Sequence, residues 1–374
     1  MHEYGICVFP DFTGKTKTED YICKSIELGY TKLFTSLILA DQHFENAADP
    51  NDPIFWQMIR SASKKGLKVY CDLNDNVISA FGSLDKVLER LHEAGVYGIR
   101  IDGGLRTGDL SYITKHPSDL VLQINASDIR TDLPYYKNLC IEALQTILKD
   151  GNLSKIEACF NYYPRQDTGI SLETVKETCS FLKGYGIKTS AFIASKKAAS
   201  FLHKESHGIM TVESLRYTKP YVASKILIQA GIDDIFFGDT LVPNEELHQL
   251  KDSCTIEPIE ILFHYWQGVP STLKEILNIR KIHYNRLDEP ECVIRCCSYR
   301  GIRNMPFNIE KRKYGTVTID NERSAQYEGE VQIVLKDLEA FSCANVIGDV
   351  DEEYHALLKY IKKGNVPFYL KGVD

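Results

Sequence analysis

Short apolar runs alternate with amphipathic helical patterns from the N-terminus as far as the region of Lys251. Eight of these runs are almost continuously apolar, which is typical of strands buried on both faces of a parallel sheet. The eight predicted strands are Tyr4–Val8, Lys32–Leu37, Lys68–Leu73, Gly98–Asp102, Val121–Asn125, Lys155–Asn161, Lys188–Ile193 and Asp233–Gly238.

The regular repeat of strand and helix predicts the fold class. A glycine typical of a helix end stands before many of the strands: Gly29, Gly66, Gly95, Gly186 and Gly231. Eight strand–helix units predict an α/β fold with an N-terminal (β/α)8 barrel, or TIM barrel. The alternative is an open, doubly wound sheet, but no glycine-rich dinucleotide fingerprint follows the first strand.

The pattern changes near Cys254, after which short strands dominate. One helix is expected around Asp351–Lys362. The predicted strands are Ile259–Trp266, Cys292–Cys297, Gly315–Asp320, Gly329–Leu335, Asn345–Val350 and Val366–Leu370. We therefore expect a catalytic barrel domain over residues 1–254 and a smaller, mostly β domain over residues 255–374.

Composition and charge exclude several classes of partner. The chain has 374 residues, 44% of them hydrophobic, and a formal net charge of -7. Basic residues are not clustered, so neither nucleic acid nor an anionic membrane is an expected partner. No apolar run is long enough to span a bilayer, and no signal peptide is evident. The 11 scattered cysteines show no zinc-ligand spacing, so we expect reduced thiols, a cytoplasmic location, no metal and no cofactor.

The stretch Lys155–Ser171 carries the densest set of candidate binding groups. Its strand stops before Pro164, which cannot donate to a ladder, and the chain then presents Asn161, Tyr163 and Arg165. Functional sites of parallel α/β proteins lie where the strands end. Further back, Arg100 and Glu157 lie on strand faces that should point inward, and we expect them to form a deep structural ion pair.

Carboxylates gather at or beyond the predicted strand ends. Paired carboxylates suit glycoside hydrolysis, in which one protonates the leaving oxygen and the other attacks or activates water. They equally suit a metal, but no histidine joins them at a strand end. Arg165 and Arg216 could hold an anion bidentately. The carboxylates are Asp11, Asp41, Asp72, Asp102, Asp128, Asp167 and Asp239, with Glu213 in the segment after the seventh strand.

Several stretches in the same order along the chain together resemble the bacterial 6-phospho-N-acetylmuramidase (MupG-like) family, whose members were long described as uncharacterised or "outer surface" proteins. They are Phe34–Leu37, Gly98–Asp102, Ile124–Ser127, Asn161–Arg165 with Thr168-Gly169, Thr211–Glu213 with Arg216, Gly238-Asp239, Asn285–Asp288, Gly315–Asn321 and Tyr327–Gln332. The resemblance implies a TIM barrel followed by a cyclophilin-like β domain. It also implies cytoplasmic hydrolysis of the β-1,4 bond in 6-phospho-N-acetylmuramyl-N-acetylglucosamine, a step of cell-wall recycling.

On this basis the expected partner is a small phosphorylated sugar. Asp102, Glu213 and Asp239 are the predicted acid and nucleophile or base, with Asp41 in reserve. Arg165 and Arg216 would hold the phosphate or the lactyl carboxylate. Asn161 and Tyr163 would orient the sugar, and Asp72 is a further predicted substrate ligand. The role of each carboxylate and the oligomeric state stay open.

Three segments depart from the family pattern: Ile38–Gln42 after the second strand, Phe160 before Asn161, and His203–Met210. These departures keep two alternatives open. One is a sugar-phosphate-binding protein of the same fold that has lost catalysis. The other is a barrel lyase or isomerase on a sugar phosphate, which would need a catalytic lysine or a metal.

Overall fold

The computed structural model describes residues 2–9, 15–38, 53–101, 107–131, 133–198 and 208–374. The chain forms two compact units, Met1–Thr255 and Ile256–Asp374. Each unit is described below by itself. None of the helices in the described ranges is long and apolar enough to cross a membrane.

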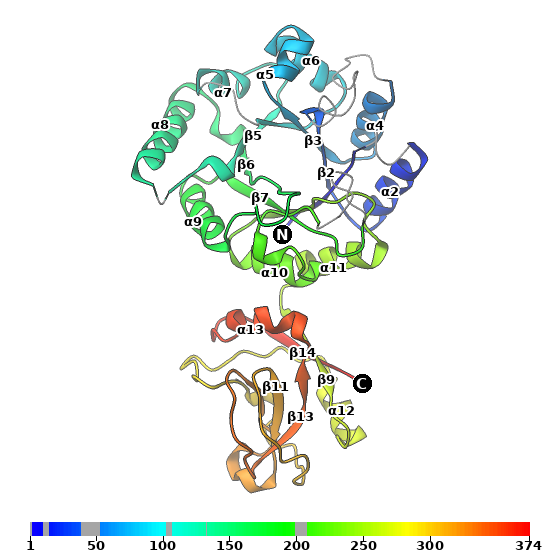
Figure 1. Cartoon of the computed structure of the whole chain (residues 1–374), viewed down its shortest axis with the longest axis vertical. Helices are drawn as coiled ribbons and strands as arrows, with labels where there is room; N and C mark the ends of the chain where they lie inside the picture. Colours follow the sequence, from blue (N-terminus) through cyan, green and yellow to red (C-terminus); the bar gives the residue numbers. More distant parts are fainter. Residues whose placement is uncertain (1, 10–14, 39–52, 102–106, 132, 199–207) are drawn as a thin grey trace. The chain divides into compact units, whose positions relative to one another are not determined.

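The first unit is a closed barrel of eight parallel strands in the order β1 to β8, with β8 pairing back onto β1. Figure 1 shows the helices as an outer ring around these strands. The strands are β1 (Tyr4–Cys7), β2 (Lys32–Thr35), β3 (Lys68–Leu73), β4 (Gly98–Ile101), β5 (Val121–Asn125), β6 (Ile156–Cys159), β7 (Lys188–Ile193) and β8 (Asp234–Phe237). The barrel and all eight of its strands confirm the prediction from the apolar runs.

Helices connect successive strands, and their ends follow local sequence signals. Ser83 and Ser171 cap α6 and α9 by accepting hydrogen bonds from backbone N–H groups three residues on. Gly66 and Gly231 adopt φ of 93° and 101°, which only glycine adopts readily, just before β3 and β8. The helices are α2 (Lys15–Glu27), α4 (Pro53–Lys64), α5 (Asp75–Phe81), α6 (Leu84–Glu93), α7 (Thr107–Ile113), α8 (Pro134–Asp150), α9 (Leu172–Lys183), α10 (Pro220–Gln229) and α11 (Asn244–Thr255), with 3-10 turns η1 (Ala126–Asp128), η2 (Leu153–Lys155) and η3 (Glu213–Leu215).

An aromatic cluster fills part of the barrel core. The rings of Phe34 and Phe236 each lie 5.6 Å from the ring of Phe192. The ring of Tyr162, beyond the end of β6, lies 5.2 Å from Phe192. Buried aromatic surface of this kind contributes strongly to stability, so these rings stabilise the part of the barrel that carries the carboxyl ends of the strands.

Charged side chains meet near the amino ends of the strands. The buried Lys32 Nζ lies 2.6 Å from Asp234, 3.5 Å from Glu3 and 4.0 Å from Glu157. Glu157 also accepts a hydrogen bond from the Tyr70 hydroxyl at 2.9 Å. The expected Arg100–Glu157 pair is therefore wrong, because Glu157 is shared between β2 and β3 partners and Arg100 donates to Asn161 instead.

We expect Tyr70→Phe to lower the free energy of unfolding by about 1.5–3 kcal/mol, the usual contribution of a hydrogen bond to a charged group. Activity of the folded variant should stay unchanged, because the amino end of a TIM barrel serves stability. Urea unfolding and initial rates would measure the two effects. Tyr97→Phe, at a ring that is 36% exposed, is the matched control, and equal destabilisation in both variants would remove the assigned role of the Tyr70 hydroxyl.

The second unit is built on one six-stranded sheet with the order β10-β12-β11-β13-β9-β14. Only β14 runs parallel to its neighbour, β9, and the other pairs are antiparallel. The predicted smaller β domain is thus confirmed, and α12 is the one α-helix of this unit that the sequence pattern did not predict. The elements are β9 (Ile259–Tyr265), α12 (Ser271–Leu277), β10 (Val293–Cys296), η4 (Cys297–Tyr299), β11 (Thr316–Asp320), η5 (Glu322–Tyr327), β12 (Val331–Val334), β13 (Ala344–Val350), η6 (Glu352–Tyr354), α13 (His355–Ile361) and β14 (Phe368–Val373).

Candidate active site

Most of the predicted site residues lie in or just beyond the carboxyl ends of the barrel strands. Asp72 is the fifth residue of β3, Asn161 lies two residues beyond β6, and Asp239 lies two residues beyond β8. The carboxyl ends of parallel strands open at one end of a barrel, where TIM-barrel sites are found. The predicted catalytic residues Asp41 and Asp102 lie outside the described residues.

Asp239 is the most unusual of the described carboxyl groups. Its side chain is fully buried. Its Oδ2 accepts backbone hydrogen bonds from Ser195 at 2.7 Å and Ile209 at 3.2 Å. Its Oδ1 has no hydrogen-bond partner in the described part of the chain. Burial raises the pKa of the Asp239 carboxyl to about 7, against the lowering effect of the two backbone bonds.

This arrangement indicates where the proton of a neutral Asp239 would reside. Oδ2 already accepts two N–H bonds, so a proton is best accommodated on Oδ1. The resulting O–H donor has no acceptor among the described residues. A carboxylic acid with a pKa near neutrality and an unused donor is what general acid catalysis requires.

Asp72 is also buried but has no unused oxygen. Its Oδ2 accepts from the Ser36 hydroxyl at 2.5 Å, and its Oδ1 accepts from the backbone N–H groups of Leu37 and Ile38 at 2.7 and 3.0 Å. Burial raises the pKa of Asp72 to about 6. These bonds hold the chain that follows β2, so the geometry favours a supporting role for Asp72 over direct contact with substrate.

Glu213 is held as a carboxylate. Arg216 binds it bidentately, with Nε and Nη2 each 2.7 Å from one oxygen. The backbone N–H groups of Asp167 and Gly169 donate to the same two oxygens at 3.1 and 2.7 Å. The Arg216 hydrogen bond is the main cause that lowers the pKa of Glu213 to about 2. A group that stays ionised at neutral pH cannot supply a proton, so Glu213 does not suit the acid role.

Arg216 uses all its N–H groups within the protein. Besides Glu213, it donates to the carbonyl oxygens of Tyr163, Gly208 and Arg165 at 2.9–3.0 Å, and its side chain is only 1% exposed. A guanidinium has five N–H donors, and five are engaged here. Arg216 therefore has no donor left for the anion that the sequence pattern suggested, and it fastens the segment after β6 to the segment after β7.

Arg165 has the opposite character. Its side chain is exposed, and its guanidinium forms no hydrogen bond or ion pair with the described residues. Its backbone carbonyl is fixed by Arg216 at 3.0 Å. Asn161 accepts a hydrogen bond from Arg100 through its side-chain oxygen, and its backbone N–H donates to Ser127 at 2.8 Å. Within the described residues, the Arg165 guanidinium and the side-chain amide N–H groups of Asn161 thus have no partner, and Tyr163 is half-buried.

Glu246 is a buried acid near Asp239 that the sequence analysis missed. It lies in the first turn of α11 and accepts hydrogen bonds from the Ser195 hydroxyl and the Lys196 backbone. Its charge raises the pKa of Asp239 further. In the sequence, Glu245 and Glu246 resemble ordinary acidic residues at a helix start, which complement the helix dipole. Burial of one of them depends on the packing of α11 and is not evident from sequence.

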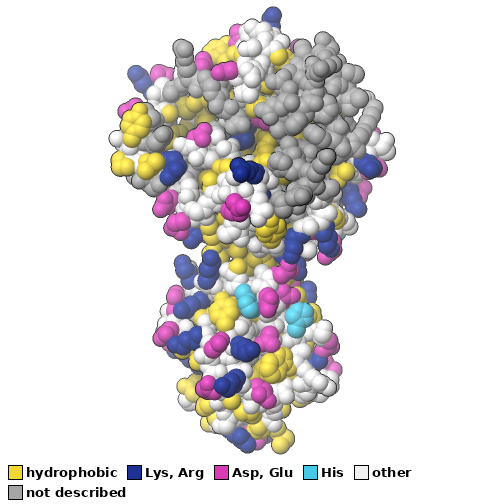
Figure 2. All heavy atoms as spheres, viewed as in Figure 1, with side chains coloured by type: hydrophobic (Ala, Val, Ile, Leu, Met, Phe, Trp, Pro, Cys, Tyr) yellow, Lys and Arg dark blue, Asp and Glu magenta, His cyan; other side chains and the backbone are white. Residues whose placement is uncertain are grey.

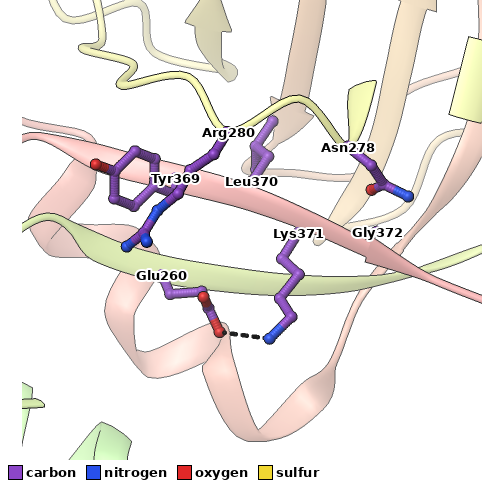
Figure 3. Close-up of a pocket in the computed structure, with 7 residues that line it drawn as sticks. All are labelled: Glu260, Asn278, Arg280, Tyr369, Leu370, Lys371 and Gly372. Atoms are coloured by element: carbon purple, nitrogen blue, oxygen red, sulfur yellow. Dashed lines mark hydrogen bonds and ion pairs between the residues drawn. The ribbon is translucent and has the colours of Figure 1, made fainter. Parts of the chain in front are cut away.

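The second unit contains cavities that are lined by described residues. Figure 3 shows one of about 420 Å³ beside β14, lined by Arg280, Tyr369, Lys371 and Glu260 among others. Its cations are already engaged, because Lys371 lies 3.3 Å from Glu260 and the Arg280 guanidinium stacks 4.3 Å from the Tyr369 ring centre. Among the described residues, no group of three His, Cys, Asp or Glu side chains is placed to hold a metal ion.

Two protein-family models together match almost the whole chain. Residues 4–252 match the family model described as "6-phospho-N-acetylmuramidase, N-terminal", and residues 259–371 match the model "6-phospho-N-acetylmuramidase, C-terminal". No curated protein matches the sequence.

Two solved structures are similar over the whole chain. An uncharacterized B. cereus protein has a TM-score of 0.83 at 24% identity, covering 100% of this chain and 99% of its own. A conserved Enterococcus faecalis protein of unknown function has a TM-score of 0.74 at 26% identity, covering 99% and 96%. Both likenesses support the two-unit architecture.

Proposed function

The chain belongs to the 6-phospho-N-acetylmuramidase family, and from this premise we propose that its barrel is a glycoside hydrolase. The proposed substrate is a 6-phosphorylated amino-sugar disaccharide of the 6-phospho-N-acetylmuramyl-N-acetylglucosamine type. We place the reaction in the cytoplasm, as a step of cell-wall recycling, and expect the second unit to be cyclophilin-like. The observation that carries the proposal is the buried Asp239, whose Oδ1 has no hydrogen-bond partner among the described residues.

In the proposed reaction, the Oδ1–H group of Asp239 donates its proton to the glycosidic oxygen as the bond from that oxygen to the anomeric carbon breaks. The leaving sugar departs with a hydroxyl group. A second carboxylate attacks the anomeric carbon or removes a proton from the attacking water, and Asp102 is its predicted source. Water supplies the oxygen and hydrogen atoms that complete the two products.

In the proposed reaction, the Glu213–Arg216 pair has a positioning role. It fastens the segment after β6 through four hydrogen bonds to the backbone groups of Tyr163, Arg165, Asp167 and Gly169. A Cβ atom at Gly169 would lie 2.8 Å from Glu213 Oε2, so a larger residue does not fit. Residues placed in this way can orient a sugar without rearranging at each turnover.

We expect Arg165→Lys to raise KM for the phosphorylated substrate about 10- to 100-fold, because a lysine cannot reproduce the two parallel hydrogen bonds of a guanidinium to a phosphate. The same change should affect an unphosphorylated analogue much less. Steady-state kinetics with both substrates measure the difference. Equal losses on the two substrates would mean that Arg165 does not bind the phosphate.

Product analysis tests the proposed function. The purified chain is incubated with 6-phospho-N-acetylmuramyl-N-acetylglucosamine. The released sugars are separated, and mass spectrometry identifies and quantifies them. The proposal predicts equimolar 6-phospho-N-acetylmuramic acid and N-acetylglucosamine. A rise in melting temperature with the disaccharide and no product would instead support a binding protein, the second candidate. The departures at Ile38–Gln42, Phe160 and His203–Met210 favour that candidate most.

A further inference from the structure

A cluster of arginines surrounds one buried carboxylate in the second unit. The Glu330 side chain is 0% exposed. Arg295 donates to it through Nε and Nη2 at 2.5 and 2.9 Å. Arg300 donates through Nε and Nη2 at 2.8 and 2.5 Å, and the Gln332 amide donates at 3.0 Å. Burial would raise the pKa of Glu330, but these hydrogen bonds outweigh it and lower the pKa to about 2.

The Tyr327 ring lies close to both guanidinium groups. Their central carbons lie 5.5 and 4.9 Å from the ring centre of Tyr327, within the range of a cation–π interaction. Tyr327, Glu330 and Gln332 belong to one short stretch, Tyr327–Gln332, which the barrel chemistry does not use. This segment supplies the carboxylate, the amide and the ring that surround the two arginines, and the Cys297 thiol is a further donor to Glu330 at 3.6 Å.

The cluster has more positive charge than its own carboxylate balances. Two guanidinium charges face the Glu330 carboxylate. Of the nearby acids, Asp288 pairs with Arg286 at 2.9 Å, whereas Asp320 accepts from the neutral Ser324 hydroxyl at 3.0 Å and also interacts electrostatically with Arg295. The Nη1 groups of Arg295 and Arg300 have no partner among the described residues. Their side chains are 18% and 34% exposed, so these donors reach solvent.

A structural role alone needs only one arginine, since a single guanidinium can neutralise a buried carboxylate bidentately. The second arginine brings a like charge close to the first, and Glu330 holds the two together. Preorganised guanidinium groups with free N–H donors are the usual means of binding phosphate and carboxylate groups. Figure 2 shows acidic and basic side chains mixed over the visible face of this unit.

We propose that Arg295, Arg300 and Tyr327 form a second anion-binding site, which holds the phosphate or carboxylate group of a small molecule. The oxyanion would accept hydrogen bonds from the free Nη1 groups, and Glu330 would keep both guanidinium groups in place.

Calorimetric titration of the full chain tests the site, with inorganic phosphate and acetate as probes at constant ionic strength in chloride. All proteins carry Arg165→Gln, so that the anion ligand proposed for the barrel is absent and the two proposals fail independently. We expect Arg300→Gln to weaken binding of a probe about tenfold or more. Arg303→Gln, at an exposed arginine three residues away, is the matched control and should leave binding unchanged.

Glu330→Gln should change anion affinity in the opposite direction. It removes the negative charge and keeps both arginines, so anion affinity should rise if the variant keeps its melting transition. The probe whose affinity changes, phosphate or acetate, identifies the chemical class of the ligand. No detectable binding of either probe, or equal weakening by Arg300→Gln and Arg303→Gln, would overturn the site and leave Arg300 a structural partner of Glu330.

Discussion

Asp239→Asn is expected to lower kcat on the phosphorylated disaccharide by about 10²- to 10⁴-fold, the usual contribution of a general acid. The fold should persist, because the amide oxygen of an asparagine can accept the two N–H bonds that Oδ2 accepts now from Ser195 and Ile209. Initial rates and a melting curve at the same pH measure both properties. Asp233→Asn, at a carboxylate that bonds Thr189 before β8, is a control outside the proposed site.

The pH dependence of Asp239 has a defined sign. Its pKa in the folded chain is about 7, above the ordinary value of 3.8, so the folded state binds this proton more tightly than the unfolded state. The carboxyl group therefore lowers stability progressively as pH rises from about 4 to about 7, and the penalty is constant above that. Activity that needs the protonated form should fall as pH rises through about 7.

The asparagine variant should lose both effects. Its melting temperature relative to the wild type should increase with pH up to about 7, because the penalty for the charged carboxylate is gone. Its residual activity should lack the alkaline limb. A wild-type rate that stays constant between pH 6 and 8 would contradict the assignment of Asp239 as proton donor.

Arg216→Leu is expected to lower the free energy of unfolding by about 3–5 kcal/mol, because it leaves the Glu213 carboxylate and three carbonyl groups without their main donor. The carbonyl oxygens are those of Tyr163, Arg165 and Gly208. Urea unfolding at pH 7 measures the loss. Acid should reduce the difference between wild type and variant between about pH 4.5 and 2, because the unfolded chain takes up the Glu213 proton near pH 4.5 and the folded wild type does so only near pH 2.

The matched control is Arg165→Leu, in the same segment. Arg165 is exposed and its side chain makes no polar contact with the described residues, so its removal should change stability by no more than about 0.5 kcal/mol. A similarly small effect of Arg216→Leu would mean that the segment after β6 does not depend on the Glu213–Arg216 pair. Arg216 would then again be a candidate for anion binding.

The barrel could be predicted from sequence because its strands are buried on both faces. Runs such as Lys68–Leu73 and Lys188–Ile193 carry this signal locally, and the structure has strands with these bounds. The helix α12 was missed because its seven residues, Ser271–Leu277, are too short to show a clear period.

The partners of the site residues could be predicted less well. Alternation along β4 and β6 placed Arg100 and Glu157 inward, but it does not fix which inward groups meet across the barrel. By contrast, the spacing of Glu213 and Arg216, three residues apart, was a usable signal for their pairing. Burial is the main cause of the raised pKa of Asp239, with a further rise from Glu246, against the lowering effect of the hydrogen bonds from Ser195 and Ile209. All of these groups are distant from Asp239 in sequence, so no local pattern could have distinguished it from the other strand-end acids.

The most direct test of the account compares two leaving groups in the Asp239→Asn variant. A disaccharide needs a proton on its departing oxygen, whereas a 2,4-dinitrophenyl glycoside of 6-phospho-N-acetylmuramic acid departs without one. We predict that the variant loses about 10²-fold or more on the disaccharide and retains nearly wild-type turnover of the dinitrophenyl substrate. Equal losses on the two substrates, or wild-type rates on both, would contradict the claim that Asp239 is the general acid of a glycoside hydrolase.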